Sequence, residues 1–458
     1  MLYRRFCQFI QQNELIVAGE PLIIGISGGP DSVVLGHLLK RWQLEHGGSF
    51  WVAHIHHGLR KEADGEAELV ARLAEEWGFS FHPKRLELTR IAQERSESLQ
   101  TAARRERLKF FRELAGIAGA GKVALGHQAN DQAETVLFWF LRGCGPAGLA
   151  GIRPSADLGW GRLVHPLLPF WRDEVLKYLQ QHQLSFAVDK SNLEPKYLRN
   201  RLRLELLPHL QAEYNPKISQ HLAGLASRLR EVEEYLAMQA NLVYQQLALT
   251  CAPGELRVAV SALASLPPAL LAVLWPKFIN EIGASTQDFG ASHYHELAAL
   301  LNPGKSGSFC HLPGAVVVRR EFDQLLFNIH YQPPDRLPAV YLDLGEPVQW
   351  GDYQFCLETA QKIAAAQKNT LYLDAAKLEL PLIIRGIEAG DRISSQGRRK
   401  KVKRYLNKNR IPISERAKLP IIISGSQVVC LAGIRLADGF ATTADCQEIY
   451  CLSWSAVK

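Results

Sequence analysis

The sequence lacks any apolar run close to the roughly 18 residues that a membrane-spanning helix needs. Its opening residues, MLYRRFCQFIQQNE, are charged and amphipathic, without the apolar stretch or small-residue cleavage site of a secretory signal. The eight cysteines are scattered and form neither a C-x-x-C pair nor a metal-like spacing. Reduced thiols in a cytoplasmic protein with no membrane partner are therefore the expectation.

Composition is that of an ordinary globular protein. The chain has 458 residues, of which 47% are hydrophobic and 22% are charged. This length exceeds what one hydrophobic core usually serves and predicts two or three domains. The balance of apolar and charged residues argues against extensive disorder.

Positive charge is concentrated in one segment near the C-terminus. Residues 385–418 hold twelve Lys or Arg and three Asp or Glu, a local charge of +9, so the remainder carries −2 of the total of +7. Such a basic stretch is typical of a surface that binds a phosphate backbone. A solvated surface without a partner is the alternative that charge alone leaves open.

Strand and helix patterns alternate between residues 20 and 190. Short apolar runs at 22–26, 50–55 and 122–126 are each followed by a helical pattern, at 31–42, 61–77 and 130–142, and a further helix is expected over 99–115. This alternation predicts an α/β fold with a doubly wound parallel sheet. In such sheets, ligands bind beyond the carboxyl ends of the strands.

The rest of the chain changes character twice. Residues 217–302 are rich in Leu, Ala and Gln and predict helices, and Pro333, Pro334 and Pro338 mark a linker. Short apolar runs with turn signals follow. We therefore expect a catalytic domain over 1–215, a helical substrate-handling domain over 216–332 and a small basic α+β domain over 333–458.

The first motif with chemical meaning follows the first predicted strand and reads Ser27, Gly28, Gly29, Pro30, Asp31, Ser32. Two glycines let the backbone turn sharply and approach an anion closely. The start of the following helix offers N–H groups and partial positive charge. The loop has no lysine, so it is not a Walker A motif. A capped turn is the alternative; the strand, loop and helix context favours phosphate binding.

The second motif, ALGHQANDQAET over 124–135, spans the end of a predicted strand and the start of a helix. Asp131 and Glu134 are three residues apart and therefore share one helix face. Paired carboxylates at this end of the sheet suit Mg²⁺ binding, recognition of an ammonium group or proton transfer. Helix capping by acidic side chains explains the same spacing.

Together these motifs resemble those of the tRNA(Ile)-lysidine synthetases, within the superfamily of N-type ATP pyrophosphatases that share the SGGPDS loop. Further stretches resemble the same family in order along the chain: AHIHHGLR (53–60), ARRER (103–107), LRG to GI (141–152), DKSN (189–192), Tyr197 with RNR (199–201), Arg203 and Pro208, and KLP (418–420) with AGIR (432–435). Two positions depart from the family pattern, Gly126 in place of alanine and Gln128 where a second histidine is common. The role of a paired histidine is thereby in doubt.

The resemblance implies an enzyme that uses ATP and Mg²⁺. It places the pyrophosphate of ATP on the Ser27–Ser32 loop, with Asp31 as the metal ligand. His54 and His127 are then cofactor contacts, and Asp131, Glu134 and Arg199 are catalytic. Without the resemblance, the histidines at 54, 56 and 57 also fit core packing or a metal site. The basic helix over 104–112 is also typical of a solvent-exposed helix without a binding role. The same holds for the arginines at 199, 201 and 203.

The implied reaction ligates L-lysine to the wobble cytidine of tRNA(Ile) with a CAU anticodon, through an adenylated cytosine, and releases AMP and pyrophosphate. The cytosine leaves its stack to enter the site. Arg199 stabilises phosphoryl charge, the two carboxylates meet the lysine ammonium, and the basic C-terminal segment positions the tRNA. Two alternatives stay open: another ATP-pyrophosphatase enzyme such as a tRNA thiolase, and a non-catalytic tRNA-binding protein. The oligomeric state is left open, a homodimer included.

Overall fold

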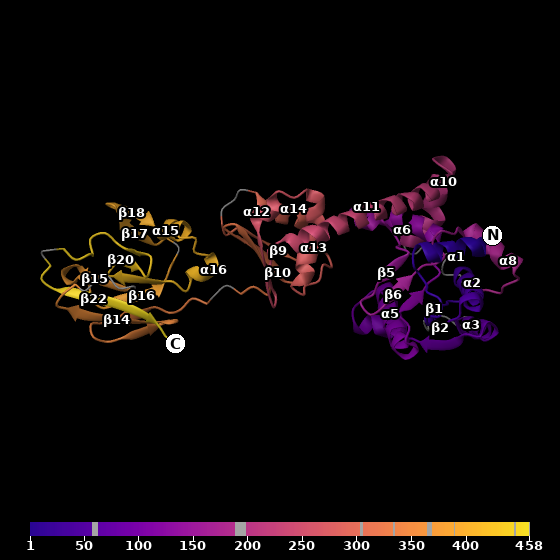
Figure 1. The fold of residues 1–458 in the computed structure, drawn as a ribbon, viewed down its shortest axis with the longest axis horizontal. Coiled ribbons are helices and arrows are strands. Elements are labelled where there is room, and N and C mark those ends of the chain that lie inside the picture. The colour runs from indigo at the N-terminus through magenta and orange to yellow at the C-terminus, as the bar shows by residue number, and fades with distance from the viewer. Residues whose placement is uncertain are drawn as a thin grey trace. The chain divides into compact units, whose positions relative to one another are not determined.

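The computed structural model describes residues 1–56, 63–187, 198–302, 306–332, 335–363, 369–388, 390–443 and 446–457. The chain divides into two compact units, Met1–Tyr235 and Leu236–Lys458 (Figure 1). Of the described helices, none combines the length and the apolar character needed to span a bilayer.

A six-stranded sheet forms the centre of the first unit. Its strands lie in the order β3-β2-β1-β4-β6-β5, and all neighbours run parallel except β5 and β6. The strands are β1 (Leu22–Gly25), β2 (Phe50–His56), β3 (Ser80–Arg85), β4 (Lys122–Ala124), β5 (Ser155–Asp157) and β6 (Arg162–Val164). The predicted doubly wound parallel sheet is confirmed.

Helices cover both faces of this sheet because successive strand residues point to opposite sides. Leu22 and Ile24 of β1 enter one core together with α1, α2, α3 and α8, whereas Ile23 enters a second core against α5. The helices of the unit are α1 (Leu2–Gln12), α2 (Pro30–His46), α3 (Ala63–Trp77), α4 (Leu88–Glu94), α5 (Leu99–Ala118), α6 (Ala129–Leu141), α7 (Pro146–Leu149) and α8 (Arg172–Gln181).

A run of helical segments follows the sheet. It consists of α9 (Leu198–Arg201), a π-helical turn η2 (Leu202–Leu206), α10 (Leu207–Glu213) and the long α11 (Ile218–Gln246). Leu202 and Leu207 are buried against Leu137 of α6. This small apolar cluster holds the arginine-bearing turn beside the second motif. Helix α11 begins in the first unit and ends in the second.

The helices predicted for the middle region are present, and a five-stranded antiparallel sheet that the sequence did not predict accompanies them. Its order is β7-β8-β11-β10-β9. The elements are β7 (Thr250–Ala252), β8 (Glu255–Ala259), α12 (Val260–Ala264), α13 (Pro268–Glu281), α14 (Ala291–Leu301), β9 (Phe309–Leu312), β10 (Val316–Glu321) and β11 (Gln324–Ile329). One hydrophobic core, which includes Trp275 and Phe327, joins the sheet to these helices.

The C-terminal part has its own core, built mainly from strands. Two larger sheets have the orders β12-β16-β19-β20-β21 and β13-β14-β22-β15, and a β17-β18 pair lies in the basic segment. The strands are β12 (Val340–Leu342), β13 (Val348–Trp350), β14 (Tyr353–Ala360), β15 (Thr370–Asp374), β16 (Leu382–Gly386), β17 (Arg392–Ser395), β18 (Arg398–Lys401), β19 (Pro420–Ser424), β20 (Gln427–Leu431), β21 (Arg435–Leu436) and β22 (Ile449–Ala456). Short helical segments are η3 (Ala375–Lys377), α15 (Val402–Lys408) and α16 (Ile413–Arg416). The predicted division into three domains, with boundaries after residues 215 and 332, stays a prediction.

Glycine 36 lets α2 pack closely on α3, which gives a test of the fold. A Cβ at Gly36 would overlap the indole ring of Trp77, which is buried and has little room to move. We expect Gly36→Ala to destabilise the protein by about 1–3 kcal/mol, the usual range for overpacking. Thermal unfolding followed by circular dichroism measures it.

The matched control is Gly116→Ala on α5, where nothing lies within 4 Å of the added carbon. Because alanine favours helix over glycine by roughly 0.5–1 kcal/mol, this variant should melt at or slightly above the wild-type temperature. Equal melting temperatures of the two variants would contradict the packing described for α2 and α3.

Candidate active site

The two motifs meet where the strand order of the sheet reverses. Strands β1 and β4 are parallel neighbours, with β2 and β3 on one side and β6 and β5 on the other. The loop over 26–29 leaves the carboxyl end of β1, and the loop over 125–128 leaves the carboxyl end of β4. This is the switch point at which open α/β sheets bind ligands.

Gly126 lets these two loops approach each other. A Cβ at this position would lie 3.1 Å from the backbone carbon and oxygen of Asp31 and 3.2 Å from the backbone nitrogen of Ser32. An alanine, which the family pattern led us to expect here, would push the loops apart by a few tenths of an ångström. The glycine at position 126 therefore allows a closer approach of the second loop to the first loop than an alanine would.

The first loop is closed by its own serines. Gly28 has φ +89°, a conformation that glycine adopts without strain. The Ser32 hydroxyl accepts a hydrogen bond from the Ser27 N–H at 3.2 Å and donates to the Gly29 carbonyl at 2.9 Å. Pro30 occupies the first turn of α2, where its missing N–H is not needed. The loop is thus shaped before any ligand binds, with the start of α2 directed at the site.

Asp31 is the residue of this loop that best fits a cation. Its Oδ1 atom is buried and has no hydrogen-bond partner among the described residues. Burial, followed by the charge of Asp131, raises the pKa of Asp31 to about 6. The described residues contain no group of three or more His, Cys, Asp or Glu side chains that would hold a metal by themselves. One or two carboxylates suffice for Mg²⁺ when phosphates and water supply the other ligands.

Asp131 and Glu134 lie in the first turns of α6, as predicted, but in different environments. Asp131 accepts a hydrogen bond from the backbone N–H of Gln128 at 3.0 Å, so the capping role is real. Its other oxygen faces Arg203 at 3.0 Å. Glu134 is almost fully buried, with 2% of its side chain exposed. Asp131 therefore caps α6 and also faces the arginines of the site, whereas Glu134 is buried beside them.

Arg203 is the main partner of both carboxylates, and the sequence alone did not single it out. Its guanidinium donates to the two oxygens of Glu134 at 2.5 and 2.9 Å and to Asp131. Arg199, which we had preferred, lies further away, 3.4 Å from Glu134 and 3.7 Å from Asp131. The four-residue spacing from Arg199 to Arg203 was the signal that both arginines share one helical face.

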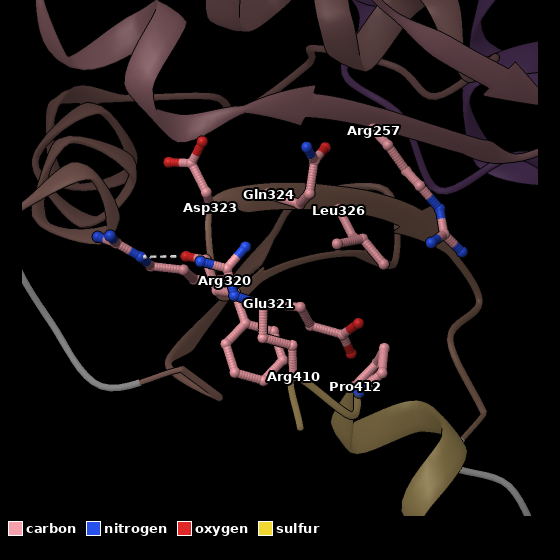
Figure 2. A pocket seen from close by; sticks show the side chains of 9 residues that line it. Arg257, Arg320, Glu321, Asp323, Gln324, Leu326, Arg410 and Pro412 are labelled. Atoms are coloured by element: carbon pink, nitrogen blue, oxygen red, sulfur yellow. Dashed lines mark hydrogen bonds between the residues drawn. The ribbon is translucent and has the colours of Figure 1, made fainter. Parts of the chain in front are cut away.

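These side chains surround a cavity of about 250 Å³. Its lining consists of His127, Asp131, Arg199, Asn200 and Arg203. A larger cavity of about 610 Å³ lies in the second unit beside the β10–β11 hairpin (Figure 2). No residue of the SGGPDS loop or of the 124–135 motif lines that second cavity, although Arg410 of the basic C-terminal segment does. The smaller cavity at the strand ends is therefore the candidate active site.

His127 has a histidine neighbour that the sequence did not reveal. The rings of His127 and His165 lie edge to face with centroids 4.8 Å apart. The Nδ1 of His165 donates to the carbonyl of Arg153 at 2.8 Å, which fixes its tautomer. Burial, followed by the charge of His165, lowers the pKa of His127, so His127 is neutral at neutral pH. Position 165, rather than 128, thus supplies a paired histidine.

The predicted His54 lies next to the first loop but is buried. Its Nδ1 donates to the carbonyl of Ile26, the residue before Ser27, at 2.9 Å. His56 faces Asp64 at 3.1 Å. The remaining residues of that motif, His57 to Arg60, lie outside the described residues, as do Asp189 to Asn192 and Tyr197. A contact of His54 with ATP stays a prediction.

The basic helix α5 divides its arginines between two roles. Arg105 is paired with Glu97 and Glu106. The buried Nε of Arg107 has no hydrogen-bond partner in the part of the chain that the structure describes, and the charge of Arg107 acts on both His127 and His165. The helix therefore contributes the charge of Arg107 to the surroundings of His127 and His165.

The basic C-terminal segment exposes most of its charge. On β17, β18, α15 and the following turn, the exposed basic residues are Arg392, Arg398, Arg399, Lys401, Lys403, Arg404, Lys408 and Arg410. Arg385, in contrast, forms an ion pair with Asp391 at 2.8 Å and serves the fold. The segment thus contains two kinds of basic residue: exposed ones, which form a positively charged surface, and Arg385, which is ion-paired within the fold.

Comparison with known proteins matches both ends of the chain. Residues 2–210 match the PP-loop domain family, and residues 382–454 match the TilS substrate C-terminal domain. The chain is 26% identical to the tRNA(Ile)-lysidine synthase of Clostridioides difficile (strain 630) over 98% of both proteins. It is 30% identical to the bifunctional protein TilS/HprT of Listeria monocytogenes serovar 1/2a over 92% of this chain and 65% of that protein. A crystal structure of a TilS C-terminal domain is similar to 26% of this chain and covers 99% of that domain, at 21% identity and a TM-score of 0.25.

The ion pair between Arg203 and Glu134 can be tested by stability. We expect Arg203→Leu to destabilise the protein by on the order of 2 kcal/mol, because the buried Glu134 loses two hydrogen bonds. Arg201→Leu is the matched control, since Arg201 is exposed and, among the described residues, pairs with Glu205 alone, at 3.5 Å. Urea unfolding should leave the control within roughly 0.5 kcal/mol of the wild type. Adding Glu134→Leu to Arg203→Leu should restore stability, because the unpaired charge is then gone; no restoration would contradict this assignment.

Proposed function

Because this chain belongs to the tRNA(Ile)-lysidine synthase family, we propose that it ligates L-lysine to the wobble cytidine of tRNA(Ile) with a CAU anticodon, consuming ATP. The reaction passes through an adenylated cytosine and releases pyrophosphate and AMP. The observation that carries the proposal is the position of the SGGPDS loop at the same switch point of the sheet as the acids and arginines of the cavity. There, the charges of Asp131 and Arg203 act on Asp31 of the loop.

ATP is proposed to bind with its pyrophosphate on the Ser27–Ser32 loop. The glycine backbone and the start of α2 suit phosphate oxygens. His54 bonds to the residue before the loop, and His127 lines the cavity. A neutral His127 donates or accepts a hydrogen bond without adding charge. Asp31 is the proposed Mg²⁺ ligand, and the ion, when bound, neutralises charge on the pyrophosphate as it leaves.

The first step activates the base. The ring carbonyl oxygen of the cytosine attacks the α-phosphorus, the bond to the β-phosphate breaks, and pyrophosphate departs. Negative charge develops on the phosphoryl oxygens during this step. Arg199 lines the cavity and is half-exposed, so its guanidinium can contact these oxygens. Arg203, held by Glu134, adds positive charge at the same wall of the cavity.

The second step joins lysine to the activated base. The ε-amine attacks the carbon that bears the activated oxygen, the carbon–oxygen bond breaks, and AMP leaves. Lysine arrives as an ammonium ion and needs an acidic partner to bind it and take a proton. Asp131 lines the cavity, whereas Glu134 is buried behind the arginines. We therefore assign lysine recognition to Asp131 and the positioning of Arg203 and Arg199 to Glu134.

The tRNA is proposed to contact the exposed basic residues of β17, β18 and α15. These side chains suit the phosphate backbone, which positions an RNA without reading its sequence. The proposal of a cytoplasmic protein follows from a tRNA substrate. Sulfur transfer by a related enzyme needs a reactive thiol, and Cys430 does not supply one, because it is fully buried and burial raises its pKa to about 12.

Lysine incorporation tests the proposed reaction. Purified protein with ATP, Mg²⁺, labelled lysine and tRNA(Ile) bearing a CAU anticodon should transfer label into RNA. Asp131→Asn should lower incorporation at least a hundredfold and raise the KM for lysine, because an amide binds ammonium poorly and takes no proton. Glu205→Gln, an exposed carboxylate nearby in sequence, is the control and should keep near wild-type activity. Release of pyrophosphate without lysine transfer would assign the nucleophile to another molecule.

The Mg²⁺ site has its own test. Asp31→Asn should raise the Mg²⁺ concentration needed for half-maximal pyrophosphate release at least tenfold, because the charged ligand is replaced by a neutral one. The control, Asp173→Asn, changes an exposed carboxylate at the start of α8 and should leave the Mg²⁺ dependence unchanged. An Asp31→Asn enzyme with unchanged Mg²⁺ dependence would remove Asp31 from the metal site.

A further inference from the structure

The end of helix α6 is apolar, exposed and unexplained by the fold. Trp139, Phe140 and Leu141 are consecutive, with 40%, 64% and 53% of their surfaces exposed. Single exposed apolar residues are common on proteins, but a contiguous group of large ones usually marks an interaction surface. We refer to these three residues and the neighbouring Arg142 as the α6 end surface.

Trp139 and Arg142 of this surface continue the face of α6 that carries Asp131, whereas Phe140 and Leu141 lie on other sides of the helix. Residues three or four apart lie on one side of a helix, so Asp131, Thr135, Phe138 and Arg142 form one row, with Glu134 and Trp139 beside it. At 1.5 Å per residue, Trp139 lies about 12 Å along the axis from Asp131. Between them, Arg199 comes within 3.5 Å of the Thr135 hydroxyl. The surface therefore adjoins the cavity that is proposed to receive the wobble base.

The chemistry of the surface suits unpaired bases. The guanidinium of Arg142 lies over the ring of Phe138 at 4.4 Å and close to that of Trp139 at 6.0 Å. Aromatic rings and arginine planes are the side chains on which proteins stack single-stranded bases. No acidic residue occurs from 135 to 156, whereas this stretch includes two arginines. A polyanion is therefore attracted to this surface.

A second copy of the chain fits the surface less well. In a symmetric dimer each residue faces the same patch of its partner, so Arg142 of one copy would approach Arg142 of the other without an acidic residue in the segment to compensate. RNA brings both the bases and the opposite charge.

We propose that the α6 end surface stacks the unpaired anticodon-loop bases that flank the wobble cytidine while that cytidine occupies the cavity. The inference rests on the proposed function for its choice of RNA. Stacking on Trp139 holds the loop open beside the site, so that extruding the wobble base does not leave its neighbours exposed to water.

A double-mutant cycle tests the contact. Binding of tRNA(Ile) with a CAU anticodon is measured for wild-type protein and Trp139→Ala, each with the normal tRNA and with a tRNA that is abasic at the nucleotides flanking the wobble position. Loss of one stacked base corresponds to at least about a fivefold change in affinity. We expect Trp139→Ala to weaken binding of the normal tRNA by at least this factor, and the abasic tRNA to bind both proteins equally.

Two further variants control for structure. Trp139→Phe keeps a stacking ring and should bind within about twofold of the wild type. Leu44→Ala removes an apolar side chain that is 78% exposed near the far end of α2 and should change nothing. Additive losses in the cycle would overturn the proposal. So would weaker binding that accompanies the loss of a dimer in light scattering. If wild-type protein shows the coupling but transfers no lysine, the proposed function fails and the RNA surface stands.

Discussion

The candidate site depends on the neutralisation of one buried carboxylate. The side chain of Glu134, on α6, is buried. An unpaired charge at this position would destabilise the protein by several kcal/mol. Arg203, 69 residues later in the chain, provides the compensating charge. This pair fastens the helical segment over α9 and η2 against α6. It thereby places Arg199 and Asn200 on the wall of the cavity, opposite the two loops of the sheet.

The resulting charge distribution suits a reaction with two successive demands. Activation of a base by ATP needs positive charge near the phosphates, which Arg199, Arg203 and a cation on Asp31 would supply. Displacement by lysine needs an accessible acid. Asp131 lines the cavity, where one of its oxygens caps α6 and the other faces Arg203. In this account the buried Glu134 positions the arginines, and the accessible Asp131 binds lysine and takes its proton.

Sequence alone predicted the parallel sheet, both loops and the paired acids, because strand alternation and glycine-rich turns are local signals. It did not predict the contacts that depend on tertiary packing. Arg203, in the π-helical turn, approaches Glu134 more closely than Arg199 does. His165 meets His127 because each follows the end of one of two adjacent strands, β6 and β4. The antiparallel sheet of the middle region was missed because its short strands follow a long stretch with strong helical composition. The Mg²⁺ ligand and the roles of the two acids stay predictions.

The most direct test of the account is a single-turnover reaction without lysine. Wild-type protein, tRNA(Ile) with a CAU anticodon, Mg²⁺ and ATP labelled at the α-phosphate are mixed, and label is followed in the RNA. The account predicts that label enters the tRNA as an adenylate and is released as AMP when lysine is added. Lysine transfer that proceeds with no labelled tRNA at any time would contradict an adenylated base and, with it, the roles assigned to the residues of this site.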